Sequence, residues 1–580
     1  MIKKTLDMDS QSYSPSLFKY TRLKTRQIHV GMLSMGGDSP IRVQSMTTTD
    51  TNDVEGSAEQ SMRIIDAGGE IVRLTTQGER EARSIGKVRE LLNTRGYRTP
   101  LVADVHFNPK AALTAAAVVE AVRINPGNYT GEAKRFNSDA DTLDDEKWHK
   151  MIVEKLRPLV EICKEHGTAL RIGVNHGSLS DRVMAKYGDT PEGMVASCTE
   201  YLDALEELGF QDVAISIKSS NTRVMVETVR LLAATLRERK EVYPLHLGVT
   251  EAGSDAEGRI KSAAGIGALL NDGIGDTIRV SLTEAPEAEI PVAQALVAYC
   301  SRLERLEGVP KVKIEKYSPF AYRRRVSVNV GGIGGNCAPI VVCDGNIKAD
   351  WVKCGENKIQ SGSGESVKVI PLSLGRLLEM NEGDLVLLRK QRDAVIVGQC
   401  MTGNYQAEFR ALAIELSNRG IDLPLVCKYE NATVDHEQYQ LEIAADLGGL
   451  LIDGLVDGIW VSDEALETAL ILLQATRARF SRTEFISCPG CGRTLYDIQA
   501  TVAQIKARFG HLKGLKIGVM GCIVNGIGEM ADADYGYVGA GRGKISLYRG
   551  KEVVRRSLDQ GEALEALKQI IAEDGKWQEP

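Results

Sequence analysis

The sequence predicts an α/β protein with three parts: an N-terminal (β/α)8 barrel of the TIM type, a central α/β insert domain and a C-terminal α+β domain. Three observations predict this organisation. The chain of 580 residues is too long for one hydrophobic core. Short β-branched segments alternate with segments of helical period from about residue 41 to 282. Prolines and clustered positive charge then interrupt the alternation at 310–326, so we expect domains at 1–305, 306–480 and 481–580.

The first part contains the segments that we expect to form barrel strands. They are 41–46, 70–76, 101–106, 121–126, 169–175, 213–219, 245–250 and 277–282. Eight successive β-α units within about 250 residues match the size of a closed barrel. An open doubly wound sheet is the alternative.

The second part mixes strand-like and helix-like segments. The strand-like segments are 338–344, 384–390, 394–400, 423–429 and 458–463, and the helix-like segments are 405–420 and 463–480. The glycine run at 330–335 lacks both the dinucleotide spacing and the P-loop lysine, so we expect a flexible turn there. Because no catalytic constellation is found in this region, a structural or spacing role is expected.

Composition restricts the class of protein. A formal net charge of -7 argues against a general nucleic-acid surface. The N-terminal residues lack the apolar segment of a secretion signal, and no run reaches the roughly 18 apolar residues of a membrane span. The 11 cysteines therefore favour reduced thiols. We expect a cytoplasmic protein that binds neither nucleic acid nor membrane.

Three cysteines near the C-terminus have ligand spacing. Cys488 and Cys491 form a C-x2-C pair after an expected strand, and Cys522 follows another strand and begins a glycine-rich loop that reaches Glu529. Thiolates in this pattern suit either zinc or an iron–sulfur cluster. The glycines favour the cluster, because the backbone can then approach a bulky inorganic core. A carboxylate ligand from Glu529 would leave one iron open to substrate.

Polar side chains on or just after the barrel strands form a second constellation. Charge inside a parallel barrel is costly unless it faces the C-terminal mouth, where barrel enzymes work. Taken singly, each cation is more often part of a structural ion pair. Cations on five different strands would instead form a ring suited to a diphosphate. They are Arg73, Arg123, Arg171, Lys218 and Arg279.

The segments SCPGCGRTLYD (487–497) and GVMGCIVNGIGEMADADYGYVGA (518–540) closely resemble the C-terminal domain of the 4-hydroxy-3-methylbut-2-enyl diphosphate synthase family of the non-mevalonate isoprenoid pathway. VQSMT, IVRLT, ADVHFNP, RINPGN, RIGVNHGSL, IKSSN, VTEAG and IRVSL extend the resemblance over the barrel. The central segment resembles the insert of the plant and some bacterial three-domain members.

The resemblance implies a C-terminal iron–sulfur domain and a substrate. A 4Fe-4S cluster would be held by Cys488, Cys491, Cys522 and Glu529, with Asn525 as a further active-site residue beside it. The barrel would bind 2-C-methyl-D-erythritol 2,4-cyclodiphosphate. The binding residues carried over are Arg73, Arg123, Arg171, Asn175, His176, Lys218, Arg279 and Ser281, and the catalytic ones are Glu251 as acid/base or orienting carboxylate, with Asp104 and His106 nearby.

The implied reaction is reductive ring opening and dehydration to 4-hydroxy-3-methylbut-2-enyl diphosphate, with two electrons from ferredoxin or flavodoxin. In the short members of the family, the cluster domain of one subunit caps the barrel of its partner. The insert leaves open whether this chain forms such a homodimer or closes on itself. Two other classes also stay open: a zinc-stabilised barrel enzyme with lyase or aldolase chemistry, and a cluster-bearing redox sensor.

Overall fold

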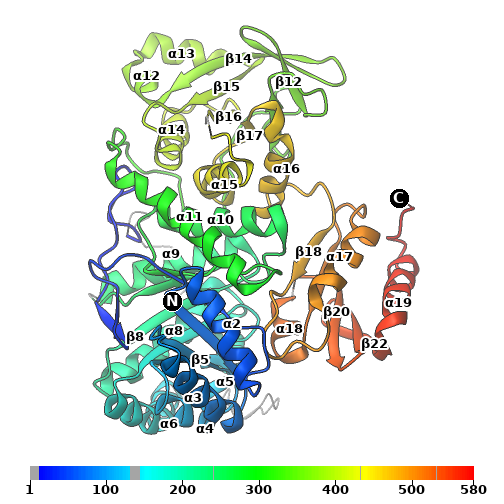
Figure 1. The fold of residues 1–580 in the computed structure, drawn as a ribbon. Helices are drawn as coiled ribbons and strands as arrows, with labels where there is room; N and C mark the ends of the chain where they lie inside the picture. The colour runs from blue at the N-terminus through cyan, green and yellow to red at the C-terminus, as the bar shows by residue number, and fades with distance from the viewer. Residues whose placement is uncertain (1–11, 131–143, 240, 431–432, 531, 580) are drawn as a thin grey trace.

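The computed structural model describes residues 12–130, 144–239, 241–430, 433–530 and 532–579. Figure 1 shows the N-terminal barrel in blue to green, the central domain above it in green to yellow, and the C-terminal domain beside the barrel in orange to red. Within these residues, no helix combines the length and apolar character needed to cross a membrane.

The N-terminal part is a closed barrel of eight parallel strands, as predicted, and not an open doubly wound sheet. The strands follow one another in chain order, and β10 pairs with β3 to close the barrel. They are β3 (Arg42–Met46), β4 (Ile71–Thr76), β5 (Leu101–Val105), β6 (Ala121–Ile124), β7 (Ala169–Asn175), β8 (Val213–Lys218), β9 (Leu245–Leu247) and β10 (Thr277–Ile278). Each lies within a segment predicted as a strand.

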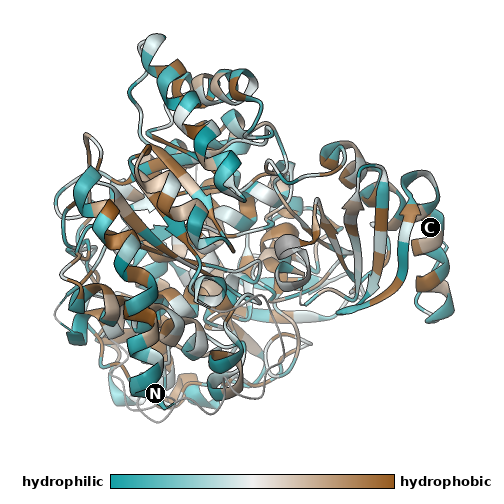
Figure 2. Cartoon of the chain, turned by 90° about the horizontal axis from the view of Figure 1, so that it is seen from below, coloured by the Kyte–Doolittle hydropathy of each residue, from teal (hydrophilic) through white to brown (hydrophobic). Residues whose placement is uncertain are grey.

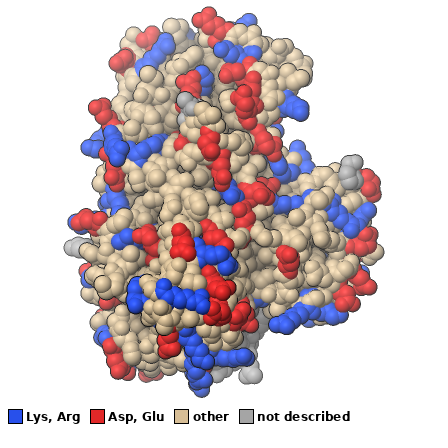
Figure 3. Space-filling model, in the orientation of Figure 1, with Lys and Arg blue, Asp and Glu red and all other residues tan. Residues whose placement is uncertain are grey.

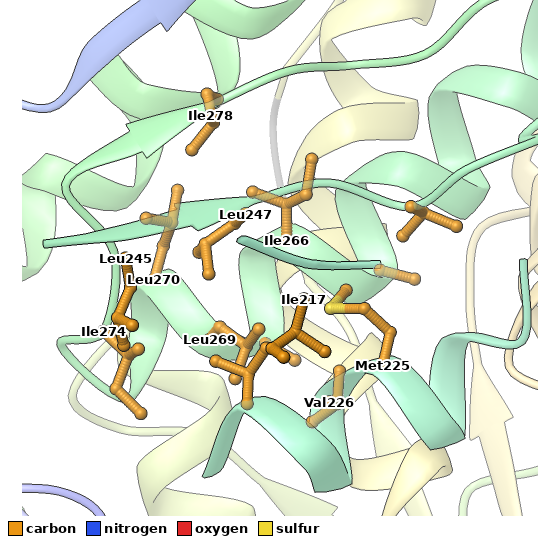
Figure 4. Packing of buried hydrophobic residues seen from close by; sticks show 14 of the residues in the cluster. Ile217, Met225, Val226, Leu245, Leu247, Ile266, Leu269, Leu270, Ile274 and Ile278 are labelled. Atoms are coloured by element: carbon orange, nitrogen blue, oxygen red, sulfur yellow. The ribbon is translucent and has the colours of Figure 1, made fainter. Parts of the chain in front are cut away.

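Helices cover the outside of this barrel, and Figure 2 shows hydrophilic residues on their outer faces. They are α2 (Val54–Asp66), α3 (Glu79–Thr94), α4 (Pro109–Ala116), α5 (Pro126–Tyr129), α6 (Asp145–His166), α7 (Asp181–Tyr187), α8 (Pro191–Glu207), α9 (Thr222–Arg239), α10 (Asp255–Asn271) and α11 (Glu289–Ser301). Their apolar faces pack on the strands, as Ile266 of α10 does beside Ile217 and Leu247 in Figure 4.

A short hairpin closes the N-terminal end of the barrel. It consists of β1 (Ile28–Val30) and β2 (Leu33–Met35). Ile28, Val30 and Met35 are buried against residues near the starts of five barrel strands, such as Ile71 and Val102. The opposite, C-terminal end is therefore the one available for a site.

The central part is a second closed barrel. Its strands are β11 (Ile340–Cys343), β12 (Trp351–Gly355), β13 (Lys358–Ser361), β14 (Ser366–Ser373), β15 (Ala394–Gln399), β16 (Leu425–Lys428) and β17 (Gly458–Trp460). Its helices are α12 (Leu374–Glu379), α13 (Glu382–Lys390), α14 (Tyr405–Asn418), α15 (His436–Ile452) and α16 (Leu466–Ala475). β13 is antiparallel to both neighbours, whereas the other pairs are parallel.

One predicted strand of this domain is wrong. Residues 384–390 belong to helix α13, which begins after Asn381, whose side chain accepts a hydrogen bond from the Asp384 N–H. Leu385 and Leu388 are buried at helical spacing, while the intervening Leu387 is exposed. The apolar run resembled a strand because the cap and the three-residue spacing are weaker signals than its hydrophobicity.

The two barrels contain a repeated segment. SAAGIGALLNDGIGDTIRVS (262–281) and IAADLGGLLIDGLVDGIWVS (443–462) each run from a helix into the last strand of a barrel. Asp276 accepts hydrogen bonds from the Leu245 N–H at 2.9 Å and the Thr25 hydroxyl at 3.0 Å. The equivalent Asp457 accepts them from the Leu425 N–H and the Ser327 hydroxyl, both at 3.0 Å. The sequence repeat therefore corresponds to a repeat in structure.

The barrels pack together through α10 and α15, which belong to this repeat. A Cβ added at Gly267 would lie 2.7 Å from Cα of Ala445, and one at the equivalent Gly448 would lie 2.7 Å from Cα of Ala264. Small residues thus let the two helix backbones come into direct contact.

The C-terminal part is a mixed five-stranded sheet with helices. The strands are β18 (Glu484–Ser487), β19 (Lys516–Met520), β20 (Tyr535–Gly541), β21 (Lys544–Arg549) and β22 (Glu552–Asp559), and the helices are α17 (Ile498–Phe509), α18 (Ile523–Glu529) and α19 (Gln560–Glu573). The first three strands are parallel and the others antiparallel. The α+β class predicted for this part is confirmed.

The glycine-rich loop predicted after Cys522 is instead helix α18. Glycine has a low helix propensity, so the sequence alone favoured a loop. Packing overrides this preference: a Cβ at Gly526 would lie 3.1 Å from the Met520 side chain, and one at Gly528 would lie 2.6 Å from the Gly177 carbonyl oxygen. The glycines therefore allow α18 to lie between β19 and the barrel.

Candidate functional site

A cavity of about 100 Å³ lies between the C-terminal mouth of the first barrel and the C-terminal domain. Both constellations predicted from sequence contribute to it. The lining residues include Arg73, Asp104, His106, Arg123, Asn175, Lys218, Glu251, Arg279 and Ser281 of the barrel, together with Cys488, Cys491, Cys522 and Glu529. Parallel strands that end at one edge of the barrel carry most of the barrel set.

The C-terminal domain contacts the barrel mouth of its own chain directly. Ala252 and Ser487 form a parallel β-bridge across the boundary. The Thr283 hydroxyl donates to the Cys488 carbonyl oxygen at 3.2 Å. Gly177 has a φ of +79°, and a Cβ there would lie 2.4 Å from the Gly528 carbonyl oxygen. The barrel and the cysteine segment thus close one cavity within a single chain.

The thiols of Cys488 and Cys491 have different surroundings. The Gly521 N–H donates to Sγ of Cys488 at 3.3 Å, and burial raises the pKa of this thiol. Burial alone would also raise the pKa of Cys491, but the Arg493 guanidinium, with Nε 3.4 Å from Sγ, lowers it below its ordinary value. Cys491 is therefore the more readily ionised of the two.

Glu529 connects the C-terminal domain to the barrel. One carboxylate oxygen accepts a hydrogen bond from the Asn175 amide, and the other accepts one from the Thr250 hydroxyl at 3.0 Å. Its backbone carbonyl accepts another from the Ser220 hydroxyl at 3.1 Å. Glu529 is only 5% exposed, and its buried carboxylate is satisfied by polar partners from the barrel, one at the end of β7 and one in the loop after β9.

Glu251 is a buried carboxyl group beside Glu529. Burial raises its pKa well above the ordinary value, and the neighbouring Glu529 charge adds to the effect. Oε2 of Glu251 has no hydrogen-bond partner among the described residues. Its backbone has a φ of +50°, which is uncommon for a residue with a side chain. A carboxyl group with a strained backbone and a raised pKa next to a second carboxylate is typical of an acid/base site.

Asp104 is the centre of an ion-pair cluster on the barrel side. Its carboxylate lies 3.2 Å from Nη1 of Arg123, 3.8 Å from Nη2 of Arg73 and 3.7 Å from Nη2 of Arg493. Burial opposes ionisation, but Arg73, His106 and Arg123 together hold the pKa of Asp104 well below its usual range. The pKa of His106 is lowered to about 3 by burial and by Arg123, so this imidazole is neutral at pH 7.

The remaining cations of the cavity differ in how far they are neutralised. Arg279 binds Glu289 bidentately, with both N···O distances 2.9 Å. Lys218, in contrast, makes no ion pair with any described residue, and burial followed by the nearby arginines lowers its pKa well below the usual value. Uncompensated positive charge around Lys218 is therefore available for an anionic ligand.

Two residues predicted to bind substrate do not line the cavity, whereas four of the five predicted cations do. Arg171 is buried in the barrel, where Nη1 donates to Oε1 of Gln44 at 3.0 Å. His176 faces Asp189 instead, with Nε2 and Oδ2 3.5 Å apart. Strand position predicts which end of the barrel a residue lies at, but not which side chains reach the central space. Asn525 lies in α18, and its side chain is outside the described part.

The donor set fits a cluster better than a single ion. Three thiols and the carboxylate of Glu529 surround one cavity, whereas no three His, Cys, Asp or Glu side chains of the described chain are arranged to hold one metal ion. A structural zinc site needs four donors around one ion. In a cubane cluster each thiolate can bind a different iron, so the ligands are spread more widely.

Three functional side chains were missed from sequence. Arg493 lines the cavity and joins Cys491 to Asp104, Thr250 binds Glu529, and Glu289 neutralises Arg279. The position of Arg493 two residues after the C-x2-C pair was a usable signal. No sequence signal indicated Glu289, because it pairs with Arg279 only after α11 packs on the barrel.

Comparisons with known proteins match two parts of the chain to family models. Residues 25–294 match the family model of the GcpE TIM-barrel domain, and residues 484–573 match that of the GcpE protein C-terminal domain. Proteins named 4-hydroxy-3-methylbut-2-en-1-yl diphosphate synthase (flavodoxin) are similar over almost the whole chain. That of Parabacteroides distasonis is 48% identical, covering 97% of this chain and 99% of its own. That of Leptospira interrogans is 39% identical, covering 98% and 99%.

Proposed function

The chain belongs to the 4-hydroxy-3-methylbut-2-en-1-yl diphosphate synthase family, and from that premise we propose that it converts 2-C-methyl-D-erythritol 2,4-cyclodiphosphate into 4-hydroxy-3-methylbut-2-enyl diphosphate. Members of this family are iron–sulfur oxidoreductases of isoprenoid biosynthesis. One observation carries the proposal: three thiols and a carboxylate face a cationic barrel mouth across one cavity.

A 4Fe-4S cluster would be held by Cys488, Cys491, Cys522 and Glu529. When bound, this group supplies two electrons, one at a time, to the substrate. Asn175 and Thr250 hold Glu529 by hydrogen bonds from the barrel side, so they would orient the carboxylate that helps to hold the group. An exchangeable carboxylate is the arrangement expected where substrate must reach one iron.

The diphosphate would bind to Arg73, Arg123, Lys218 and Arg279, with Asn175 and Ser281 completing the contacts. Asp104 and Glu289 hold Arg123 and Arg279 in fixed orientations, so these guanidinium groups are preorganised for an anion. Lys218 has no counter-ion among the described residues, so the negative charge of the ligand would stabilise its charged form more than that of the paired arginines.

Proton supply is the second requirement of the reaction, because the ring-opened substrate loses a hydroxyl group as water. Two electrons and two protons enter, and the dehydrated product and one water leave. Glu251 is buried, has a raised pKa and lines the cavity, so we assign it as the proton donor or the group that orients the leaving hydroxyl. His106, neutral beside Arg123, serves to position Asp104.

Anaerobic purification followed by iron and sulfide analysis tests the cluster. Turnover of the cyclodiphosphate with reduced methyl viologen, followed by mass spectrometry of the product, tests the reaction. We expect four irons and four sulfides per chain at full loading and viologen-dependent product. An active preparation that contained zinc and no iron would exclude the proposal in favour of a zinc-stabilised barrel enzyme. Cluster without turnover would favour a redox sensor.

A further inference from the structure

An open groove of about 570 Å³ lies on the outer side of the cysteine segment. Its lining comes from both domains. Thr48, Asp50 and Gln77 belong to the barrel loops after β3 and β4, and the other lining residues belong to the C-terminal domain: Gly492, Arg493, Thr494, Leu495, Cys522, Ile523, Gly539, Ala540 and Arg542. The groove therefore exists only where the C-terminal domain meets the barrel.

The groove and the internal cavity share two lining residues, Cys522 and Arg493. Cys522 is half-buried, and it is one of the proposed cluster ligands. The next residue, Ile523, is 54% exposed, which is unusual for a large apolar side chain. One proposed ligand thus borders both the active-site cavity and a surface groove with an apolar contact point.

The charged residues that line the groove are Arg493, Arg542 and one carboxylate, Asp50. Arg542, on the turn between β20 and β21, is exposed and makes no ion pair with any described residue. Outside the groove, on the edge strand β22 and the turn before it, Lys551, Arg555 and Arg556 are also exposed and make no ion pair with any described residue. Figure 3 shows Lys and Arg side chains along the lower edge of the C-terminal domain, where β20 and β22 lie in Figure 1. Such a surface favours a negatively charged partner.

We propose that this groove is the docking site of the electron donor, a small acidic carrier protein of the flavodoxin class, with Ile523 as its apolar contact and Arg542 as its cationic contact. The proposal rests on the proposed function, since it assumes a cluster at Cys522. Each docked carrier loses one electron to the site and leaves oxidised by one electron. Two dockings supply the two electrons of one turnover.

Ile523→Asp and Arg542→Glu test the docking site in the full-length, cluster-loaded enzyme. Neither residue lines the active-site cavity. We expect kcat/KM for reduced flavodoxin to fall roughly tenfold or more, because docking loses an apolar contact or gains charge repulsion. The kcat with reduced methyl viologen, which needs no protein docking site, should stay at the wild-type value.

Matched controls come from the central domain. The same changes can be made away from the groove at two exposed positions. They are Ile347, which is 85% exposed, and Arg376 on α12. Ile347→Asp and Arg376→Glu should leave both assays unchanged. Flavodoxin kinetics unaffected by the groove variants would overturn the docking site, and so would an equal loss of viologen activity. A wild-type enzyme inactive with viologen would instead contradict the proposed function itself.

Discussion

Asp272 of the first barrel and Asp453 of the second bind the same buried guanidinium, that of Arg230. Asp272 lies 2.8 Å from Nη2 of Arg230 and Asp453 lies 2.5 Å from Nη1. The two aspartates occupy equivalent positions in the repeated segment. Arg410 of α14 binds Asp272 at 2.8 Å and completes the network. Each barrel therefore contributes one aspartate and one arginine to a charge network at their boundary.

Arg230→Met should destabilise the protein strongly. The substitution leaves two buried aspartates with less compensating positive charge. Such a change typically lowers the free energy of unfolding by about 3–5 kcal/mol. Thermal unfolding should show a lower Tm. The control is Arg392→Met, which breaks the exposed pair with Asp422 and should cost no more than about 1 kcal/mol. Equal Tm values for the two variants would contradict a stabilising role of the buried network.

Gly267→Ala should lower the free energy of unfolding, although alanine favours a helix by roughly 1 kcal/mol. The new Cβ would lie 2.7 Å from the Ala445 backbone, and overpacking of this kind costs about 1–3 kcal/mol or more. Gly375→Ala in α12 is the matched control, because nothing lies within 4 Å of its Cβ position. Denaturant titration should show destabilisation for the first variant and none for the second.

The raised pKa of Glu227 predicts that the stability of the protein depends on pH. Burial, followed by the charge of Asp453, raises its pKa from 4.5 to about 7. Folding therefore favours the protonated form, so its stabilising contribution is complete below pH 4.5 and is lost as the pH rises to about 7. Glu227→Gln should raise Tm at pH 8 and raise it less at pH 5. The control is the exposed Glu154→Gln, for which calorimetry should give the same Tm difference from the wild type at both pH values. If the Tm difference for Glu227→Gln were also the same at pH 5 and pH 8, the predicted pH dependence would be refuted.

Cys522→Ser should abolish both the broad visible absorption of the cluster and turnover, since it removes one proposed iron ligand. Cys354→Ser changes an exposed cysteine of the central domain and should leave both unchanged. Iron analysis after anaerobic reconstitution measures the difference. A Cys522→Ser enzyme with a full iron content and normal turnover would show that the ligand assignment is wrong.

Lys218→Met should weaken substrate binding without affecting the cluster. A lost charge-assisted hydrogen bond is worth about 1.5–3 kcal/mol, or roughly 10- to 150-fold in KM for the cyclodiphosphate. Absorption at visible wavelengths should equal that of the wild type. Lys155→Met, an exposed position on α6, serves as the control. An unchanged KM for Lys218→Met would remove Lys218 from the proposed diphosphate site.

Local sequence signals predicted the first barrel well because alternation of β-branched and helical segments is a short-range property. They failed at 384–390, where an apolar run forms α13, and at α18, where glycine-rich sequence forms a helix. At α18 packing decides the outcome, including the contact of Gly528 with the distant Gly177, whereas at 384–390 the local cap and three-residue spacing were weaker signals than the hydrophobicity of the run. The repeated segment at 262–281 and 443–462 was present in the sequence but was not identified there.

The sequence by itself determined the chemistry available to this protein: thiols at ligand spacing, carboxylates and cations at strand ends, and the family resemblance. Only the tertiary structure decided which of these groups meet. It brought Arg493 between Cys491 and Asp104, placed Glu529 on Asn175 and left Arg171 outside the cavity. The physical reason is that side-chain type and spacing are local, whereas distances across a domain boundary depend on how whole domains pack.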